Sequence, residues 1–148
     1  NFNLFDNRRR IYTHPRILPT SKISGTLIND SVVADGAIIH AAKIERSVIG
    51  VRSRIGKGST VIKTYMMGSD SYETLKEIAA RPGELLMGIG ENCHIENAIL
   101  DKSCKIGNNV TIIGGPHLPN QETDLYVISG GIVVVKKEAT IPHGFVLS

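Results

Sequence analysis

Apolar residues recur at intervals of about six along this chain. Steps of six from Ile49 meet an apolar residue each time, at Ile55, Val61 and Met67. Further series, in which some steps are of five, are formed by Val33, Ile39, Ile44 and Ile49, by Ile89, Ile95, Leu100, Ile106 and Ile112, and by Val135, Ile141 and Leu147. This period matches neither the helical repeat of about 3.6 residues nor the two-residue alternation of a long strand. It predicts a short strand followed by a corner, repeated many times.

Three such units would close one turn of a triangular coil of about 18 residues. The apolar residue of each unit is expected to point into the coil, and parallel strands would stack from one coil to the next. Glycine often follows the apolar residue, as at Gly56, Gly90 and Gly107, and we expect it there because it tolerates unusual backbone angles. The pattern predicts an all-β fold, a parallel β-helix of the hexapeptide-repeat type. In the alternative, a sandwich, turn clusters would separate the strands every 8 to 12 residues or so.

Two segments interrupt the period. Residues 68–88 contain SYETLKEIAAR, which predicts a short helix that ends at Pro82 and Gly83. Residues 114–124 are rich in Gly, Pro and Asn, which predicts a loop. Insertions at the corners of a repeat fold often carry its contacts and ligands.

The domain organisation follows from these boundaries. Residues 1–22 contain Pro15 and Pro19 and are predicted to be an extended linker. Residues 23–148 would form the β-helix domain. Because the chain opens without Met in polar sequence, we interpret it as a piece of a longer polypeptide.

Composition supports a strand-rich fold and excludes several classes of function. The chain has 31 Ile and Val residues against 10 Leu, and strands favour β-branched side chains. The formal net charge of +3 is too weak to indicate a nucleic-acid partner. No apolar run approaches the roughly 18 to 20 residues that a membrane span needs. Two cysteines, Cys93 and Cys104, are too few for a disulfide scaffold, so we expect free thiols and a cytoplasmic location. Both occupy the small inward position of their repeat units, so we expect them to be buried.

Candidate chemistry is sparse at this point. The chain has no Gly-rich phosphate loop of the usual spacing. Cys93 and His94 are adjacent, so on a strand their side chains would face opposite ways, and no metal site is expected. His40 and His94 lie beside apolar strand residues and are expected to face outward. Several lysines and arginines would bind a carboxylate or phosphate if they converged.

Five segments of the chain are distinctive: IYTHPRILPTSKI (11–23), SVIGVRSRIGKGSTV (47–61), MGSDSYET (67–74), GIGENCHIENAILDKSCKIGNNV (88–110) and GGIVVVKKEATIPHG (130–144). In this order they resemble glucose-1-phosphate adenylyltransferase, also called ADP-glucose pyrophosphorylase. The resemblance covers nearly the whole chain. It is specific, because other hexapeptide proteins lack the MGSDSYET insertion and the ILDK and GIVVV blocks.

The resemblance implies a left-handed β-helix that serves as the C-terminal regulatory and oligomerisation domain of this enzyme. The enzyme makes ADP-glucose and pyrophosphate from ATP and glucose 1-phosphate in glycogen or starch synthesis. Its N-terminal catalytic domain, which would use ATP and Mg²⁺, is not in this chain, so no residue here is expected to be catalytic. The expected partners are that catalytic domain, further copies in a tetramer, and a phosphorylated metabolite.

The resemblance also implies an effector site. Lys102 in ILDK and Lys137 in VVKKEA match lysines that contact the activator in plant and cyanobacterial members, and Arg16 in THPRILP matches a linker arginine. A phosphorylated effector needs charge-assisted donors of this kind. The expected activator is 3-phosphoglycerate, but Lys136 replaces an apolar residue of plant members, which keeps fructose 1,6-bisphosphate and fructose 6-phosphate open.

Two other functions stay open on the sequence alone. A hexapeptide acyltransferase would use His40 or His94 as a general base between identical β-helices. A purely structural β-solenoid would bind no ligand. The linker and MGSDSYET blocks count against the first of these.

Overall fold

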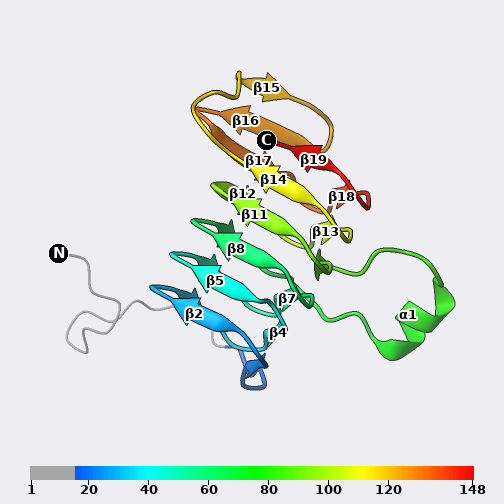
Figure 1. Cartoon of the computed structure of the whole chain (residues 1–148). Coiled ribbons are helices and arrows are strands. Elements are labelled where there is room, and N and C mark those ends of the chain that lie inside the picture. Colours follow the sequence, from blue (N-terminus) through cyan, green and yellow to red (C-terminus); the bar gives the residue numbers. More distant parts are fainter. Residues whose placement is uncertain (1–15) are drawn as a thin grey trace.

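The computed structural model describes residues 16–148, which form three sheets that the chain visits in a fixed order (Figure 1). Sheet A contains β1 (Lys22–Ile23), β4 (Ile38–Ile39), β7 (Arg54–Ile55), β10 (Gly88–Ile89), β13 (Lys105–Ile106) and β18 (Thr140–Ile141). Sheet B contains β2 (Leu27–Asn29), β5 (Lys43–Glu45), β8 (Thr60–Ile62), β11 (His94–Glu96), β14 (Thr111–Ile113) and β19 (Val146–Leu147). Sheet C contains β3 (Val32–Val33), β6 (Val48–Ile49), β9 (Tyr65–Met66), β12 (Ala98–Leu100), β17 (Ile132–Val135), β16 (Tyr126–Ser129) and β15 (Gln121–Glu122). The predicted parallel β-helix is confirmed.

The core consists of apolar side chains stacked coil upon coil. Each of the following is at most 4% exposed: Ile39, Ile55, Ile89, Ile106 and Ile141 in sheet A, Ile44, Val61, Ile95 and Ile112 in sheet B, and Ile49, Met66, Leu100 and Val135 in sheet C. Neighbours within a column are direct register partners, such as Ile95 with Val61. Apart from Met67, the predicted inward residues are confirmed or, at Val33 and Leu147 in the end coils, partly buried against this core.

The predicted register fails at Met67, because the corner from sheet B to sheet C is one residue shorter than expected. Met67 is 41% exposed, and Met66 points inward instead. The turn contains Lys63, whose φ of 45° lies in the left-handed region and lets the chain pass from sheet B to sheet C in fewer residues. Uninterrupted coils are therefore 16 or 17 residues long rather than 18: Ile39 pairs with Ile55, and Ile89 pairs with Ile106.

The glycines that follow inward residues of sheet A are needed for space rather than for unusual backbone angles. Gly56, Gly90 and Gly107 are not among the residues with positive φ. A Cβ at Gly56 would lie 2.5 Å from the carbonyl oxygen of Gly90, and one at Gly90 would lie 2.5 Å from that of Gly107. The expected role of these glycines was wrong, since neighbouring coils approach too closely here for any side chain.

The first insertion contains the predicted helix, α1 (Leu75–Ala80). Thr74 caps it, and the Glu77 carboxylate accepts a hydrogen bond from the Thr74 backbone amide at 2.7 Å, which completes a capping box. No residue of α1 is buried, and Leu75 is 86% exposed. Figure 1 shows α1 projecting away from the stacked coils. The helix is thus stabilised by its cap and not by packing on the core.

The second insertion is more than the loop predicted over residues 114–124. It contains β15 and continues into β16, and both run antiparallel to their neighbours in sheet C. Gly130 and Gly131, with φ of 56° and 80°, join β16 to β17 in a tight turn that favours glycine. Ile128 of β16 is 2% exposed, so the hairpin belongs to the hydrophobic core.

Both cysteines are buried free thiols, as predicted. Burial raises the pKa of Cys93, and burial together with the nearby Asp101 charge raises the pKa of Cys104 to about 12. In the part of the chain that the structure describes, no helix is long and apolar enough to cross a membrane. The linker predicted over residues 1–22 lies mostly outside the described residues.

Candidate functional site

Lys102 and Lys137 stand at the same corner of the β-helix, on consecutive coils. We call the turn from sheet C to sheet A the C–A corner. Both lysines come two residues after an inward residue of sheet C, Leu100 or Val135. The Glu138 amide donates a hydrogen bond to the Lys102 carbonyl at 2.9 Å, which stacks the two turns directly. Since stacked strands lie about 4.8 Å apart, the period of the fold places two like charges side by side.

A carboxylate from the first insertion reaches this corner. The Lys102 Nζ lies 2.8 Å from Asp70 Oδ1. The hydrogen bond from Lys102 lowers the pKa of Asp70, partial desolvation opposes this, and the charges of Lys102, Lys137 and Arg16 lower the pKa further. Arg16, Lys102 and Lys137 therefore act on one carboxylate, although they come from three separate parts of the chain. We call these three residues the cation cluster.

The segment that carries Asp70 is attached on both sides. Ahead of it, the Ser69 amide donates to the Val51 carbonyl at 3.0 Å, and Arg52 Nη1 donates to the Ser69 carbonyl at 3.3 Å. After it, the Tyr72 hydroxyl donates to the carbonyl of Gly36 at 2.8 Å. The Arg52 guanidinium also lies 5.7 Å from the centre of the Tyr72 ring, a distance at which cation–π attraction acts. These contacts fix the backbone beside the cation cluster.

Other acids at the corner neutralise the cluster only in part. Lys137 Nζ is 3.9 Å from Glu138 Oε1, and both side chains are more than half exposed, so this pair is weak. Asp101 Oδ1 accepts a hydrogen bond from the Lys102 backbone amide at 2.6 Å, which occupies one of its oxygens. The Lys102, Lys137 and Asp70 side chains are 41%, 56% and 55% exposed, so a dissolved anion can reach them.

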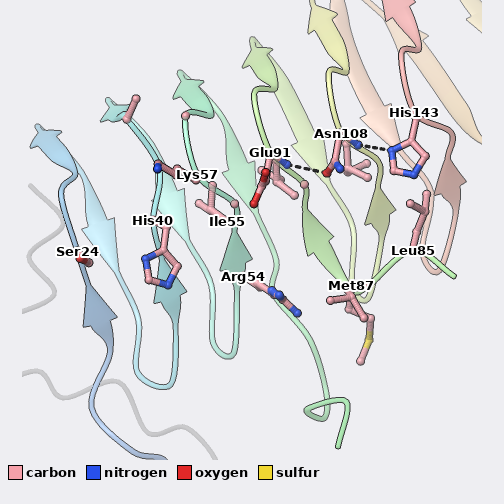
Figure 2. A pocket seen from close by; sticks show the side chains of 18 of the residues that line it. Ser24, His40, Arg54, Ile55, Lys57, Leu85, Met87, Glu91, Asn108 and His143 are labelled. Atoms are coloured by element: carbon pink, nitrogen blue, oxygen red, sulfur yellow. Dashed lines mark hydrogen bonds between the residues drawn. The ribbon is translucent and has the colours of Figure 1, made fainter. Parts of the chain in front are cut away.

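A cleft of about 940 Å³ lies at a different corner, between sheets A and B, and residues 83–87 of the first insertion line part of it. Figure 2 shows Leu85 and Met87 of this stretch beside the cleft. His40, Arg54 and Lys57 contribute polar groups, and Leu85 and Met87 contribute apolar ones, along with further residues of the lining. None of the cation cluster lines this cleft. It is a separate feature of the molecule.

The histidines expected to face outward do so to different degrees. His40 is exposed and lines the cleft. His94 is partly buried on sheet B, and its Nε2 lies 3.1 Å from Glu96 Oε2. His143 also lines the cleft, and its Nδ1 accepts a hydrogen bond from the Asn108 amide at 2.8 Å, which leaves Nε2 to carry the proton of the neutral ring (Figure 2). Within residues 16–148, no group of three or more His, Cys, Asp or Glu side chains is placed to hold a metal ion.

Sequence reasoning missed two residues at the C–A corner, Asp70 and Tyr72. The MGSDSYET block that contains Asp70 and Tyr72 was recognised as a distinctive segment, but nothing in it indicated which lysine Asp70 would meet. Asp70 and Lys102 are 32 residues apart, and their contact depends on how the insertion leaves the coil.

Stacked coils of 16 or 17 residues with one inward apolar side chain per strand define the hexapeptide class of parallel β-helix domains. The sequence profile of a family described as the GLGC left-handed parallel beta-helix domain matches residues 16–146. The chain belongs to this family, and its β-helix is left-handed.

A curated relative is the glucose-1-phosphate adenylyltransferase small subunit, chloroplastic/amyloplastic, of Triticum aestivum. It is 43% identical over 151 residues, which include 99% of this chain but only 32% of the wheat protein. The chain thus spans about a third of the length of this relative.

Proposed function

We propose that this chain is the C-terminal regulatory and oligomerisation domain of an enzyme that makes ADP-glucose and pyrophosphate from ATP and glucose 1-phosphate. The family match and the wheat relative, which is named as a glucose-1-phosphate adenylyltransferase, support this assignment. The catalytic domain would lie in the part of the enzyme that this chain does not span. ATP and Mg²⁺ would bind to that catalytic domain. The acyltransferase alternative is not favoured by the family match.

The cation cluster is the proposed effector site. The observation that carries this proposal is that the turns of Lys102 and Lys137 stack beside Asp70, which Lys102 contacts at 2.8 Å and whose pKa the charges of all three residues lower. A phosphate ester offers several oxygens and up to two negative charges to such a group. The Arg16 guanidinium can donate two parallel hydrogen bonds to a phosphate, whereas Lys102 and Lys137 act as point charges.

Regulation would follow because these donors belong to different segments of the chain. Arg16 belongs to the segment before β1, while Lys102 and Lys137 belong to the coils. An effector that binds all three would fix this segment against the side of the β-helix. If the segment leads to the catalytic domain, the effector stabilises one of two domain arrangements, which is the differential contact that allosteric control requires.

The outer face of sheet C is the proposed contact surface for assembly into a tetramer or onto the catalytic domain. Val32, Val48 and Tyr65 are 51%, 37% and 47% exposed, and they are direct register partners on neighbouring strands. An apolar row of this kind on a soluble domain usually marks a protein contact. We propose a cytoplasmic location from the buried free thiols, while the plastid named for the wheat relative is the other compartment to test.

Replacement of Lys137 by Ala in the intact polypeptide that carries this domain tests the effector site. We expect the 3-phosphoglycerate concentration for half-maximal activation to rise about tenfold, because one charge-assisted hydrogen bond worth roughly 1.5 kcal/mol is lost. Lys105→Ala is the matched control, since Lys105 points outward from sheet A rather than toward Asp70. An activation curve that is the same for Lys137→Ala and for the unaltered enzyme would remove Lys137 from the site.

A further inference from the structure

An acidic side chain already occupies the proposed phosphate site. Lys102 Nζ lies 2.8 Å from Asp70 Oδ1 and forms an ion pair with it, and the charges of Lys137 and Arg16 act on the same carboxylate. Any external anion that approaches Lys102 from this side meets a negative charge of the protein itself. The cluster is therefore not an open anion site but one that holds its own anion.

The arrangement allows the Asp70 side chain to leave while its backbone stays in place. Hydrogen bonds hold the chain at Ser69 and at Tyr72, on either side of Asp70. The Asp70 side chain itself is 55% exposed and can rotate into solvent. Exposed ion pairs contribute little net stability, so opening this one is a small cost.

A phosphate ester can accept more hydrogen bonds from the cation cluster than the Asp70 carboxylate does. Asp70 makes one hydrogen bond with Lys102 and feels Lys137 and Arg16 only through their charges. A phosphate provides several acceptor oxygens, enough to bond to all three donors at once. It would also relieve the repulsion between the stacked Lys102 and Lys137.

We propose that Asp70 is a built-in competitor, which the phosphate of an effector must displace from Lys102. Asp70 then determines the effector concentration at which the site fills. This inference rests on the proposed function, because it assumes that the cation cluster binds a phosphate ester. It goes beyond that function in giving the first insertion a direct part in effector affinity.

Calorimetric titration of the intact polypeptide with 3-phosphoglycerate tests the proposal. In Asp70→Asn the side chain keeps its shape and loses its charge, so we expect the dissociation constant to fall about three- to tenfold. Asp70→Ala should act in the same direction. Both variants should melt like the unaltered protein, since Asp70 is exposed and lies outside the core.

Glu122→Gln is the matched control. Glu122 pairs with Lys136 at 2.9 Å, a geometry almost identical to that of Asp70 with Lys102, but Lys136 is not in the cation cluster. This variant should bind 3-phosphoglycerate as the unaltered protein does. An equal gain in Glu122→Gln would show a general charge effect and overturn the role of Asp70.

Lys102→Ala separates failure of this inference from failure of the proposed function. If Lys102→Ala weakens binding while Asp70→Asn leaves it unchanged or weakens it, the site stands and the competitor role is refuted. If Lys102→Ala and Lys137→Ala both leave binding unchanged, the effector site itself is refuted.

Discussion

The two insertions are attached to the β-helix in opposite ways. The first, residues 68–88, leaves at the C–A corner and carries a helix with no buried residue. Tyr72 and Arg52 hold its start through polar and cation–π contacts. The second begins at residue 114 and continues through β15 and β16 as a hairpin, whose strands extend sheet C and whose Ile128 is buried. One insertion is thus a peripheral arm, and the other is part of the core.

The same comparison separates two ion pairs that look alike. Each insertion places an acid on a lysine, Asp70 on Lys102 at 2.8 Å and Glu122 on Lys136 at 2.9 Å. The charges of Lys137 and Arg16 also act on the carboxylate of Asp70, whereas Lys136 is the ion-pair partner of Glu122. In the proposed account, the surroundings of an exposed ion pair, rather than its length, decide whether it bears on function.

The largest expected effect concerns the core that both insertions interrupt. Ile106 is 2% exposed in the column of sheet A, and Ile106→Asp would place an unpaired carboxylate between stacked isoleucines. We expect this variant not to reach the native fold, as seen by circular dichroism and thermal melting. Thr140→Asp, at an exposed position of the same sheet, is the control and should fold. A native-like melt for Ile106→Asp would show that the register of the columns is wrong.

The second insertion should be sensitive to truncation of its buried residue. Ile128→Ala removes a fully buried side chain, which typically costs about 3 kcal/mol of the free energy of unfolding. Ile132→Ala is the control, because Ile132 lies across the same hairpin and is 45% exposed. Urea denaturation would measure both. Equal losses in the two variants would contradict the assignment of this hairpin to the core.

The base of the C–A corner should become less stable in alkali. The Cys104 thiol donates to the Asp101 carbonyl at 2.8 Å, and its pKa is raised from 9.0 to about 12. Because the folded pKa exceeds the unfolded one, the contribution of Cys104 is fully present below pH 9.0 and is lost as pH rises toward about 12. Urea midpoints of Cys104→Ala should therefore fall less steeply above pH 9.0 than those of the unaltered protein. Parallel slopes would contradict the burial of this thiol.

The smallest expected effect concerns the attachment of the arm. Tyr72→Phe removes one hydrogen bond, to the Gly36 carbonyl, and should lower the free energy of local opening at the start of the first insertion by about 1 kcal/mol. We expect faster amide hydrogen exchange at the start of the first insertion and little change in the melting temperature. Tyr65→Phe is the control, since Tyr65 is on the outer face of sheet C and 47% exposed. Loss of global stability in Tyr72→Phe would mean that the arm is part of the core.

Much of the fold and part of the site could be predicted from the sequence. The apolar period places Lys102 and Lys137 at equivalent positions of two coils, so their stacking follows from counting. The five-residue step from Val61 to Met66 could not be predicted in this way, because Lys63 takes a left-handed conformation for which its residue type gives no signal. The hairpin was missed although the Gly130-Gly131 pair is a known turn signal.

The apolar period could not predict the position of Asp70, for another reason. The period governs residues within the coils, and Asp70 lies outside it in an insertion. Its position is set by side-chain contacts of Arg52 and Tyr72 with distant backbone carbonyls. Such contacts leave no regular spacing in the sequence, so a three-dimensional structure was needed to find them.

The most direct test of the central claim is an assay of ADP-glucose formation from ATP and glucose 1-phosphate, with and without 3-phosphoglycerate. The intact polypeptide should be active and respond to the effector, and the variant with Lys102 and Lys137 both replaced by Ala should keep its basal rate but lose most of the response. The 148-residue chain alone should form no ADP-glucose. An intact polypeptide without this activity, or one whose response survives both substitutions, would contradict the account.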